Sequence, residues 1–252
     1  VHRLEAYATG RQKMFDHEGL FRRRDLPHID VEGKPIFITA CLQGSLSQVG
    51  LSKIRKYRDE LNAKRTPPDM TAAEWEMKKH KLVFKLVDSL LDRASPVKLL
   101  EEDRLAKIVQ DAFLHFADER YRLLAFVVMP SHHHWMFLPL ESFTEELARS
   151  QMNLDVKKRR TPREVISHSI QSYTATQCNC LLGTTGAFWQ TETFDHFARD
   201  EAEMLRIIDY IEQNPVVAGL VKKPAEHRWS SAHLRQILGI QPGEAIPKIA
   251  VA

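Results

Sequence analysis

The sequence has 252 residues, of which 43% are hydrophobic and 27% charged, and its formal net charge is +3. The length allows a full buried core, and the composition is that of an ordinary globular protein. The small net charge excludes attraction to nucleic acid by the chain average, so any such binding must come from local basic clusters.

The cysteines, Cys41, Cys178 and Cys180, are odd in number and lack C-x-x-C spacing. This pattern favours a reducing compartment and argues against a disulfide framework or a thiolate zinc site. The longest apolar run, 123–130, is too short to span a bilayer, and we identify no signal peptide. We therefore expect a cytoplasmic protein with no membrane partner.

The first third of the chain predicts an arm, a strand and two helices. Residues 1–34 are polar and basic and are expected to form an N-terminal basic arm. Apolar alternation at 36–42 predicts the first strand, and helical periodicity predicts helices at 47–65 and 71–93. No linker-like stretch isolates the helical pair, so we interpret it as an insertion, about 47–94, in a larger domain.

The middle of the chain predicts a helix followed by two strands. Apolar residues recur at helical spacing over 99–116, and short buried strands are expected at 121–128 and 132–138. Ser142 and Glu145 form a capping-box pattern that predicts the start of a short helix.

The last third predicts two longer helices around one more strand. Helical periodicity covers 164–182, and 188–197 is expected to form a fourth strand or hairpin. Asp200 caps a further helix that we expect to stop at Pro215, and a last short helix begins near Ser231.

The order strand, helix, strand, strand, helix, strand predicts an α+β fold. It is the order of a ferredoxin-like antiparallel sheet sandwiched by helices, here with the inserted helical pair. We expect one domain with this fold to span 35–233 and a C-terminal tail to cover 234–252.

Three consecutive histidines open the strand predicted at 132–138. Side chains alternate across a strand, so His132 and His134 share one face while His133 points to the other. Two imidazoles at neighbouring positions of one face can bind a single metal ion. A structural role for histidines at the end of a strand is the alternative.

A tyrosine and an amide lie one turn apart on the helix after Asp200. The apolar residues of this helix occupy one arc that must face the core. Tyr210 sits on the shoulder of that arc, beside Asn214 four residues on. The pattern alone is also compatible with simple packing.

Several motifs carry a resemblance to a known family. M-P-S-H-H-H at 129–134 resembles the M-P-N-H-V-H signature of the HUH single-strand endonucleases. D-Y-I-E-Q-N-P-V-V-A-G-L-V at 209–221 resembles the tyrosine-bearing helix of the REP-associated tyrosine transposases. Further similar segments are W-S-S-A at 229–232, R-R-D-L-P-H-I-D-V-E-G-K-P-I-F-I-T at 23–39, S-Y-T-A at 172–175 and F-W-Q at 188–190.

The resemblance implies a set of site residues. It makes His132 and His134 metal ligands, Tyr210 the nucleophile, and Asn214 a third ligand. Imidazole and neutral oxygen ligands without a thiolate suit Mg²⁺ or Mn²⁺, although Zn²⁺ also accepts them. The sequence departs from the family at His133, where an aliphatic residue is usual.

The resemblance also implies a function and a partner. It predicts a metal-dependent, transposase-like endonuclease that cleaves and rejoins single-stranded DNA near REP-type hairpins through a 5′-phosphotyrosine. Such a protein would be a monomer or homodimer at the bacterial nucleoid. Two alternatives remain open: another HUH nickase, such as a replication initiator or relaxase, and a hairpin-binding protein that has lost cleavage.

Candidate DNA contacts come from two basic clusters and from F-W-Q. A basic run is also compatible with a solvated face. F-W-Q-T-E-T-F-D-H lacks the basic residues often found after F-W-Q in the family. The candidates are Arg22, Arg23, Arg24, Lys157, Lys158, Arg159, Arg160, Trp189 and Gln190.

Overall fold

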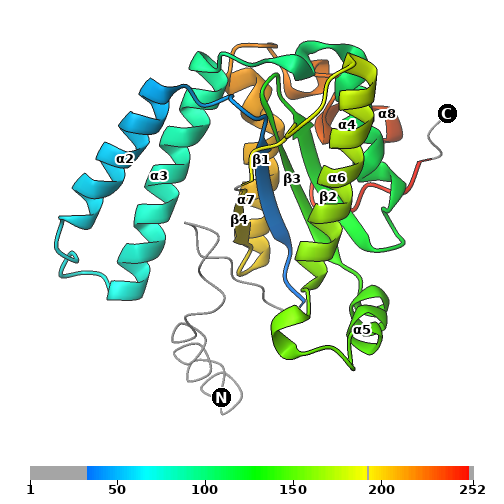
Figure 1. Cartoon of the computed structure of the whole chain (residues 1–252), viewed down its shortest axis with the longest axis horizontal. Coiled ribbons are helices and arrows are strands. Elements are labelled where there is room, and N and C mark those ends of the chain that lie inside the picture. Colours follow the sequence, from blue (N-terminus) through cyan, green and yellow to red (C-terminus); the bar gives the residue numbers. More distant parts are fainter. Residues whose placement is uncertain (1–32, 192, 250–252) are drawn as a thin grey trace.

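A four-stranded antiparallel sheet forms the centre of the computed structural model, which describes residues 33–191 and 193–249 (Figure 1). The strand order is β2-β3-β1-β4, as expected for a ferredoxin-like α+β sandwich. Most of the expected basic arm, including Arg22 to Arg24, lies outside the described residues. The strands are β1 (Ile36–Cys41), β2 (Tyr121–Val128), β3 (His132–Pro139) and β4 (Phe194–Phe197).

Two helices cover one face of the sheet, α4 (Asp103–His115) and α6 (Pro162–Leu182). Alternate residues of the central strands point toward them, so that Ile38 of β1 and Trp135 of β3 enter the same core cluster. Period-two alternation places the remaining residues of these strands on the opposite face. The His132 side chain therefore points away from α4 and α6.

The opposite face is covered by α7 (Glu201–Val217), whose Ile208 and Ile211 pack against Phe37 and Met136 of the sheet. Beyond α7, α8 (Ser231–Leu238) packs near β2. The expected domain boundary at residue 233 falls inside this helix. Its capping residue is Ser230, close to the predicted start.

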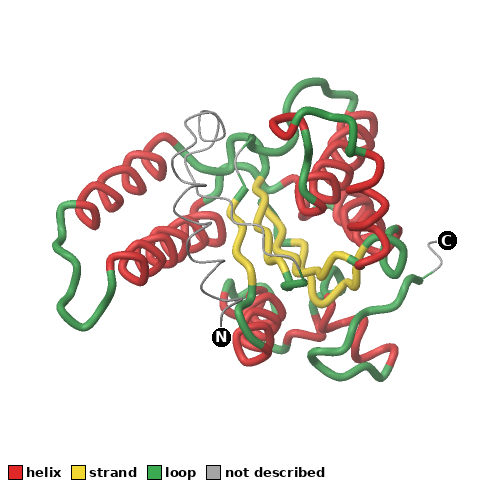
Figure 2. Tube along the Cα trace, turned by 90° about the horizontal axis from the view of Figure 1, so that it is seen from below, coloured by secondary structure: helices red, strands yellow, loops and turns green. Residues whose placement is uncertain are grey.

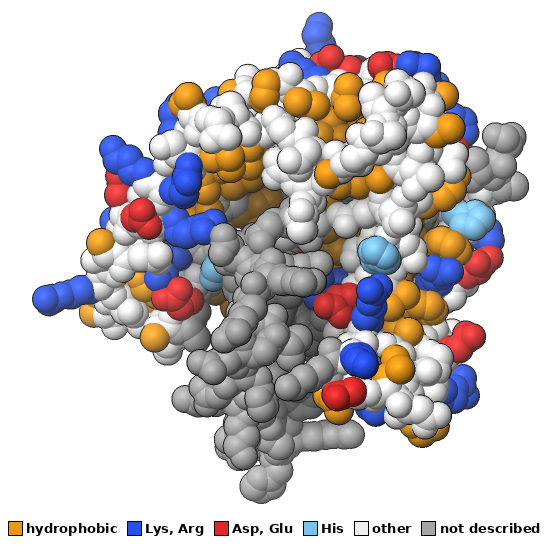
Figure 3. Space-filling view, viewed as in Figure 1, with side chains coloured by type: hydrophobic (Ala, Val, Ile, Leu, Met, Phe, Trp, Pro, Cys, Tyr) orange, Lys and Arg blue, Asp and Glu red, His pale blue; other side chains and the backbone are white. Residues whose placement is uncertain are grey.

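The inserted helices form an antiparallel hairpin, α2 (Gln48–Asn62) and α3 (Ala72–Ala94), which projects to one side of the sheet (Figures 1 and 2). The hairpin has its own apolar cluster, which includes Ile54, Leu61 and Trp75. Thr71 and Glu74 form the predicted capping box. Exposed Lys and Arg side chains project from the hairpin (Figure 3).

Two predicted helix boundaries were wrong. Helix α5 (Glu141–Ser150) begins one residue before Ser142, with Leu140 as its N-cap, so Ser142 lies in the first turn and caps nothing. Helix α7 continues past Pro215 to Val217. A proline so near a helix end removes only one intrahelical hydrogen bond, and burial of Pro215 offsets that loss.

Within the segment expected as a strand or hairpin at 188–197, residue 192 lies outside the described residues, and only 194–197 form a regular strand. Trp189 adds one isolated bridge to Leu42. The short 3-10 helices are Leu99–Glu101, Val156–Lys158 and Pro224–Glu226. None of the helices in the described part of the chain is long and apolar enough to cross a membrane.

Candidate active site

The start of β3 places His132 and His134 side by side on the face toward α3 and α7. Both side chains are fully buried, and their Nε2 atoms lie 3.2 Å apart. His133 points to the other face, where its ring meets Phe113 and Trp189 edge-on. The predicted alternation of the three imidazoles is therefore what β3 shows.

Hydroxyl groups hold the outer nitrogens of both imidazoles. Ser131 Oγ donates to the Leu91 carbonyl at 3.2 Å and lies 3.1 Å from His132 Nδ1. Because the serine proton points to that carbonyl, its oxygen accepts from Nδ1–H, which leaves the lone pair on Nε2. Thr39 Oγ1 lies 2.7 Å from His134 Nδ1. Such outer partners orient metal-binding imidazoles.

Two carboxylates of α3 face the same two imidazoles. Asp88 Oδ1 lies 3.1 Å from His134 Nε2 and 3.9 Å from His132 Nε2. Asp92 Oδ1, one turn on, lies 3.7 Å from His132 Nε2. Asp88, His132 and His134 offer three ligand atoms within 4.8 Å of one another.

Neither aspartate was predicted as a site residue from the sequence. A signal was present, because both acids interrupt the apolar face of a helix in L-V-D-S-L-L-D at 86–92. Buried acids at that spacing are rare unless they are paired or bind a cation.

Helix α7 brings Tyr210 and Asn214 to the same place. The Tyr210 hydroxyl donates to Asp88 Oδ2 at 2.5 Å, and its ring centroid lies 5.5 Å from that of His134. Asn214 Nδ2 lies 3.3 Å from His134 Nε2. The structure therefore brings together all four residues that the resemblance implied for the metal and nucleophile, and adds Asp88 and Asp92.

Burial shapes the ionisation of the site. It holds the pKa of His132 well below its usual range, and the neighbouring His134 lowers it further. It also raises the pKa of Asp92 to about 7, with a further contribution from the Asp88 charge. Burial raises the pKa of Asp88 too, but the neighbouring imidazoles of His134 and His132 and the hydrogen bond from Tyr210 outweigh this and bring it to about 2. Burial and then the Asp88 charge raise the pKa of the Tyr210 phenol far above its ordinary value.

The donor set fits a divalent cation. Within the described residues, Asp88 Oδ1, Asp92 Oδ1 and Asn214 Oδ1 are buried oxygens without a hydrogen-bond donor. Buried oxygens of this kind are costly unless paired. Carboxylate and amide oxygens with two imidazoles and no thiolate are ligands that Mg²⁺ and Mn²⁺ accept.

Another tyrosine on a helix, Tyr173 of the S-Y-T-A segment, does not lie at this site. Tyr173 is on α6, the helix that covers the opposite face of the sheet, and it is 53% exposed. The Tyr173 hydroxyl therefore cannot reach His132 and His134 of the same chain.

The basic cluster between α5 and α6 lies far from the histidines. Lys158, Arg159 and Arg160 are exposed, and the Arg159 guanidinium donates to the carbonyls of Met152 and Leu154. Because β3 begins at the histidines and ends next to α5, this cluster lies at the opposite end of the sheet (Figure 1).

The two F-W-Q candidates lie beside β1. Trp189 is only 7% exposed, and its indole N–H donates to Thr174 Oγ1 at 2.9 Å. Its ring therefore fills the core and presents little surface to DNA. Gln190 is partly exposed, and its backbone N–H donates to the Cys41 carbonyl opposite His132.

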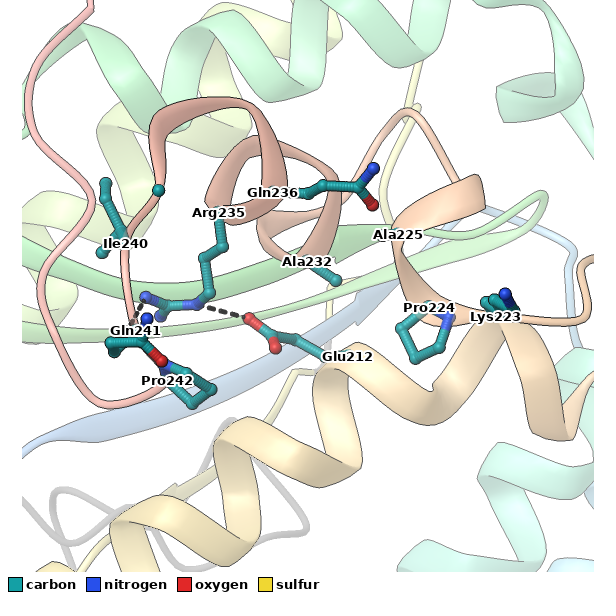
Figure 4. Close-up of a pocket in the computed structure, with 11 residues that line it drawn as sticks. Glu212, Lys223, Pro224, Ala225, Ala232, Arg235, Gln236, Ile240, Gln241 and Pro242 are labelled. Carbon is teal, nitrogen blue, oxygen red and sulfur yellow. Dashed lines mark hydrogen bonds and ion pairs between the residues drawn. The ribbon is translucent and has the colours of Figure 1, made fainter.

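A separate pocket of about 420 Å³ lies beside α8, lined by Glu212 and Arg235 among others (Figure 4). These two side chains form a buried ion pair at 2.8 Å, and Arg235 also donates to the carbonyls of Gln241 and Glu244. The pair ties α7, α8 and the following turn together, and none of the candidate site residues lines the pocket.

Comparisons with known proteins found one similar solved structure. It is a REP-associated tyrosine transposase bound to a REP hairpin, with 16% sequence identity and a TM-score of 0.47. The match covers 90% of this chain and 94% of that one. No family model matches the sequence, and no curated protein matches it.

Proposed function

We propose that this protein is a divalent-metal-dependent endonuclease of the tyrosine transposase type, which cleaves and rejoins single-stranded DNA beside REP-type hairpins. The observation that carries the proposal is the meeting of Asp88, His132 and His134 with the Tyr210 hydroxyl. All four residues belong to one chain, so we propose a site that works in the monomer.

Asp88, His132 and His134 would hold the ion, with Asn214 and Asp92 as further oxygen ligands. A bound divalent cation neutralises charge on the scissile phosphate and orients it. Thr39 and Ser131 contact the outer Nδ1 nitrogens of both imidazoles, which would leave each Nε2 to bind the cation.

Tyr210 would supply the nucleophile. Its phenol oxygen forms a bond to phosphorus while the bond from phosphorus to the 3′ oxygen breaks. In net terms the phenol proton passes to the departing oxygen, which gives a free 3′-OH and a 5′-phosphotyrosine. The reverse step, with a 3′-OH as nucleophile, rejoins the strand without ATP because the covalent bond conserves the energy.

The REP-type hairpin as partner is supported by the motifs of the chain. M-P-S-H-H-H and D-Y-I-E-Q-N-P occur in the same order as in the family that they resemble, and both fall at the site. A hairpin substrate also gives the exposed basic residues a phosphate backbone to contact.

The test uses the whole protein, Mn²⁺ and synthetic single-stranded hairpins with randomised flanks, labelled at either end. A 5′-phosphotyrosine predicts that a 3′-end label stays on the protein in a denaturing gel, while a 5′-end label is released. Chelation of Mn²⁺ with EDTA should abolish the adduct.

Retention of the 5′-end label would contradict the proposed polarity of cleavage. Binding of the hairpin with no adduct under any metal would instead support the cleavage-inactive alternative.

A further inference from the structure

The carboxylate of Asp88 has two oxygens that face different partners. Oδ1 lies 3.1 Å from His134 Nε2, on the side of the candidate metal ligands. Oδ2 accepts the hydrogen bond of the Tyr210 hydroxyl at 2.5 Å. One side chain therefore links the ligand cluster to the phenol.

This carboxylate comes from the inserted hairpin and not from the sheet or α7. Contacts on both sides of Asp88 dock α3 at this place. The Phe84 ring stacks on Phe194 with centroids 4.0 Å apart, and Lys81 Nζ lies 3.0 Å from Glu203 Oε1. On the other side, the Leu91 carbonyl accepts from Ser131 Oγ at 3.2 Å.

The rest of the pocket around Tyr210 orients its ring, and besides Asp88 the Asn214 side chain is another hydrogen-bonding group near its hydroxyl. Phe37 and Phe84 approach the ring edge-on, with centroids 6.0 and 6.1 Å from it. Aromatic edges confine a ring without selecting where a hydroxyl points. A charge-assisted hydrogen bond to a carboxylate is short and directional, and so sets that direction.

We propose that Asp88 is the positioning residue for Tyr210, and that the inserted hairpin thereby completes the active site. The expected consequence, that DNA cleavage requires helices α2 and α3 to be docked on the sheet, rests on the proposed function. The geometric part, the control of the phenol by Asp88, is independent of DNA chemistry.

Two substitutions separate positioning from ligation. Asp88→Asn keeps an oxygen acceptor of nearly the same shape for Tyr210 but removes the charge offered to a cation. Asp88→Ala removes both the oxygen acceptor and the charge. Asp92→Asn is the matched control, because Asp92 is one turn away on the same helix and lies near His132.

The experiment labels all five tyrosines with 3-fluorotyrosine and records ¹⁹F spectra without DNA. Tyr210→Phe identifies the Tyr210 signal. We expect this signal to stay near its native position in Asp88→Asn, to move in Asp88→Ala, and to change least in Asp92→Asn. Mn²⁺ titration by EPR should show affinity at least about tenfold weaker in both Asp88 variants. Adduct yield should fall by about a hundredfold in Asp88→Ala, since misplacing reacting atoms by 1 Å has an effect of this order.

An unmoved Tyr210 signal in a folded Asp88→Ala protein would overturn the proposal. If Asp88→Ala does not fold, as judged by circular dichroism, the Asp88→Asn variant decides. A Tyr210 signal displaced to the position of free tyrosine in that variant overturns the proposal. A Tyr210 signal that keeps its native position supports the proposal. If the wild type forms no adduct while the signals follow the expected series, the proposed function fails and the positioning role stands.

Discussion

The position of His133 in β3 determines which face of the sheet its ring occupies. Its neighbours on both sides face the candidate metal site, whereas its own ring lies between Phe113 and Trp189 in the core. Neither of its ring nitrogens has a hydrogen-bond partner in the described part of the chain. Burial lowers its pKa to about 3, so the ring is neutral and behaves as an aromatic filler.

Substitution of the three histidines should therefore give unequal results. His132→Ala and His134→Ala should each weaken Mn²⁺ binding at least about tenfold and abolish the adduct, while hairpin binding survives. His133→Val should leave both functions intact and change the free energy of unfolding by no more than about 2 kcal/mol, because relief of two unpaired nitrogens offsets the smaller volume. Calorimetric metal titration and thermal unfolding measure the two effects. Equal loss of metal binding in all three variants would refute the assignment of His132 and His134 to the metal and of His133 to the core.

Substitution of Tyr210 and substitution of Tyr173 should also give different results. Tyr210→Phe removes one hydroxyl, so it should keep the fold and DNA affinity but form no covalent adduct. Tyr173→Phe, a change on the exposed face of α6, should form the adduct at the native yield. Mass spectrometry of the trapped adduct would locate the nucleotide, and a modified Tyr173 would refute the assignment.

At the scale of elements, α3 is where the sequence was least informative. Periodicity located both hairpin helices to within a few residues, and the capping residue Thr71 was predicted correctly. Periodicity also gives the apolar face of a helix, but it does not say which end of that helix meets which strand. Asp88 and Asp92 join the site through such a long-range contact. The sequence marks them as unusual acids on an apolar helix face, but only the fold places them beside His132 and His134.

The packing of helices α2 and α3 against the sheet can be weakened without substituting either aspartate. Phe84→Ala removes the stack on Phe194 and should cost about 3 kcal/mol of local stability. Hydrogen exchange should then accelerate in α3 while β1 to β3 stay protected, because the hairpin keeps its own apolar cluster.

Adduct yield in Phe84→Ala should fall together with that protection. Val49→Ala, at a site 66% exposed on α2, serves as the control and should change neither measurement. Native adduct yield in a variant whose α2–α3 pair has lost its protection would show that cleavage does not require α3.

At the scale of the molecule, the candidate site and the basic cluster lie at opposite ends of β3. An eight-residue strand is about 25 Å long, so DNA that reached both would run along the sheet. The motif order and the helical and strand periods were enough to predict the sheet and the shared face of His132 and His134. They were not enough to predict that Trp189 is buried, because an aromatic residue in a loop segment has the same sequence pattern in a core and at a surface.

The salt dependence of hairpin binding tests this path. Lys158→Gln with Arg160→Gln should reduce the slope of log affinity against log salt by about 0.7 for each phosphate of a single strand that the protein no longer neutralises. Arg159 is left unchanged because it holds its own loop. Lys107→Gln, an exposed substitution on α4 that removes one positive charge away from the cluster, is the control. An unchanged slope would make the cluster a solvated surface.

The site draws on segments that are widely separated in the chain, with Thr39 first and Asn214 last. A ribosome makes these segments in that order, so every proposed ligand up to His134 emerges well before the tyrosine. At synthesis rates of about 5–20 residues per second, the delay is on the order of ten seconds. Throughout that interval the nascent chain holds the proposed ligands of α3 and β3 but not Tyr210, the proposed nucleophile. Premature termination in this region therefore yields a fragment that lacks the proposed nucleophile.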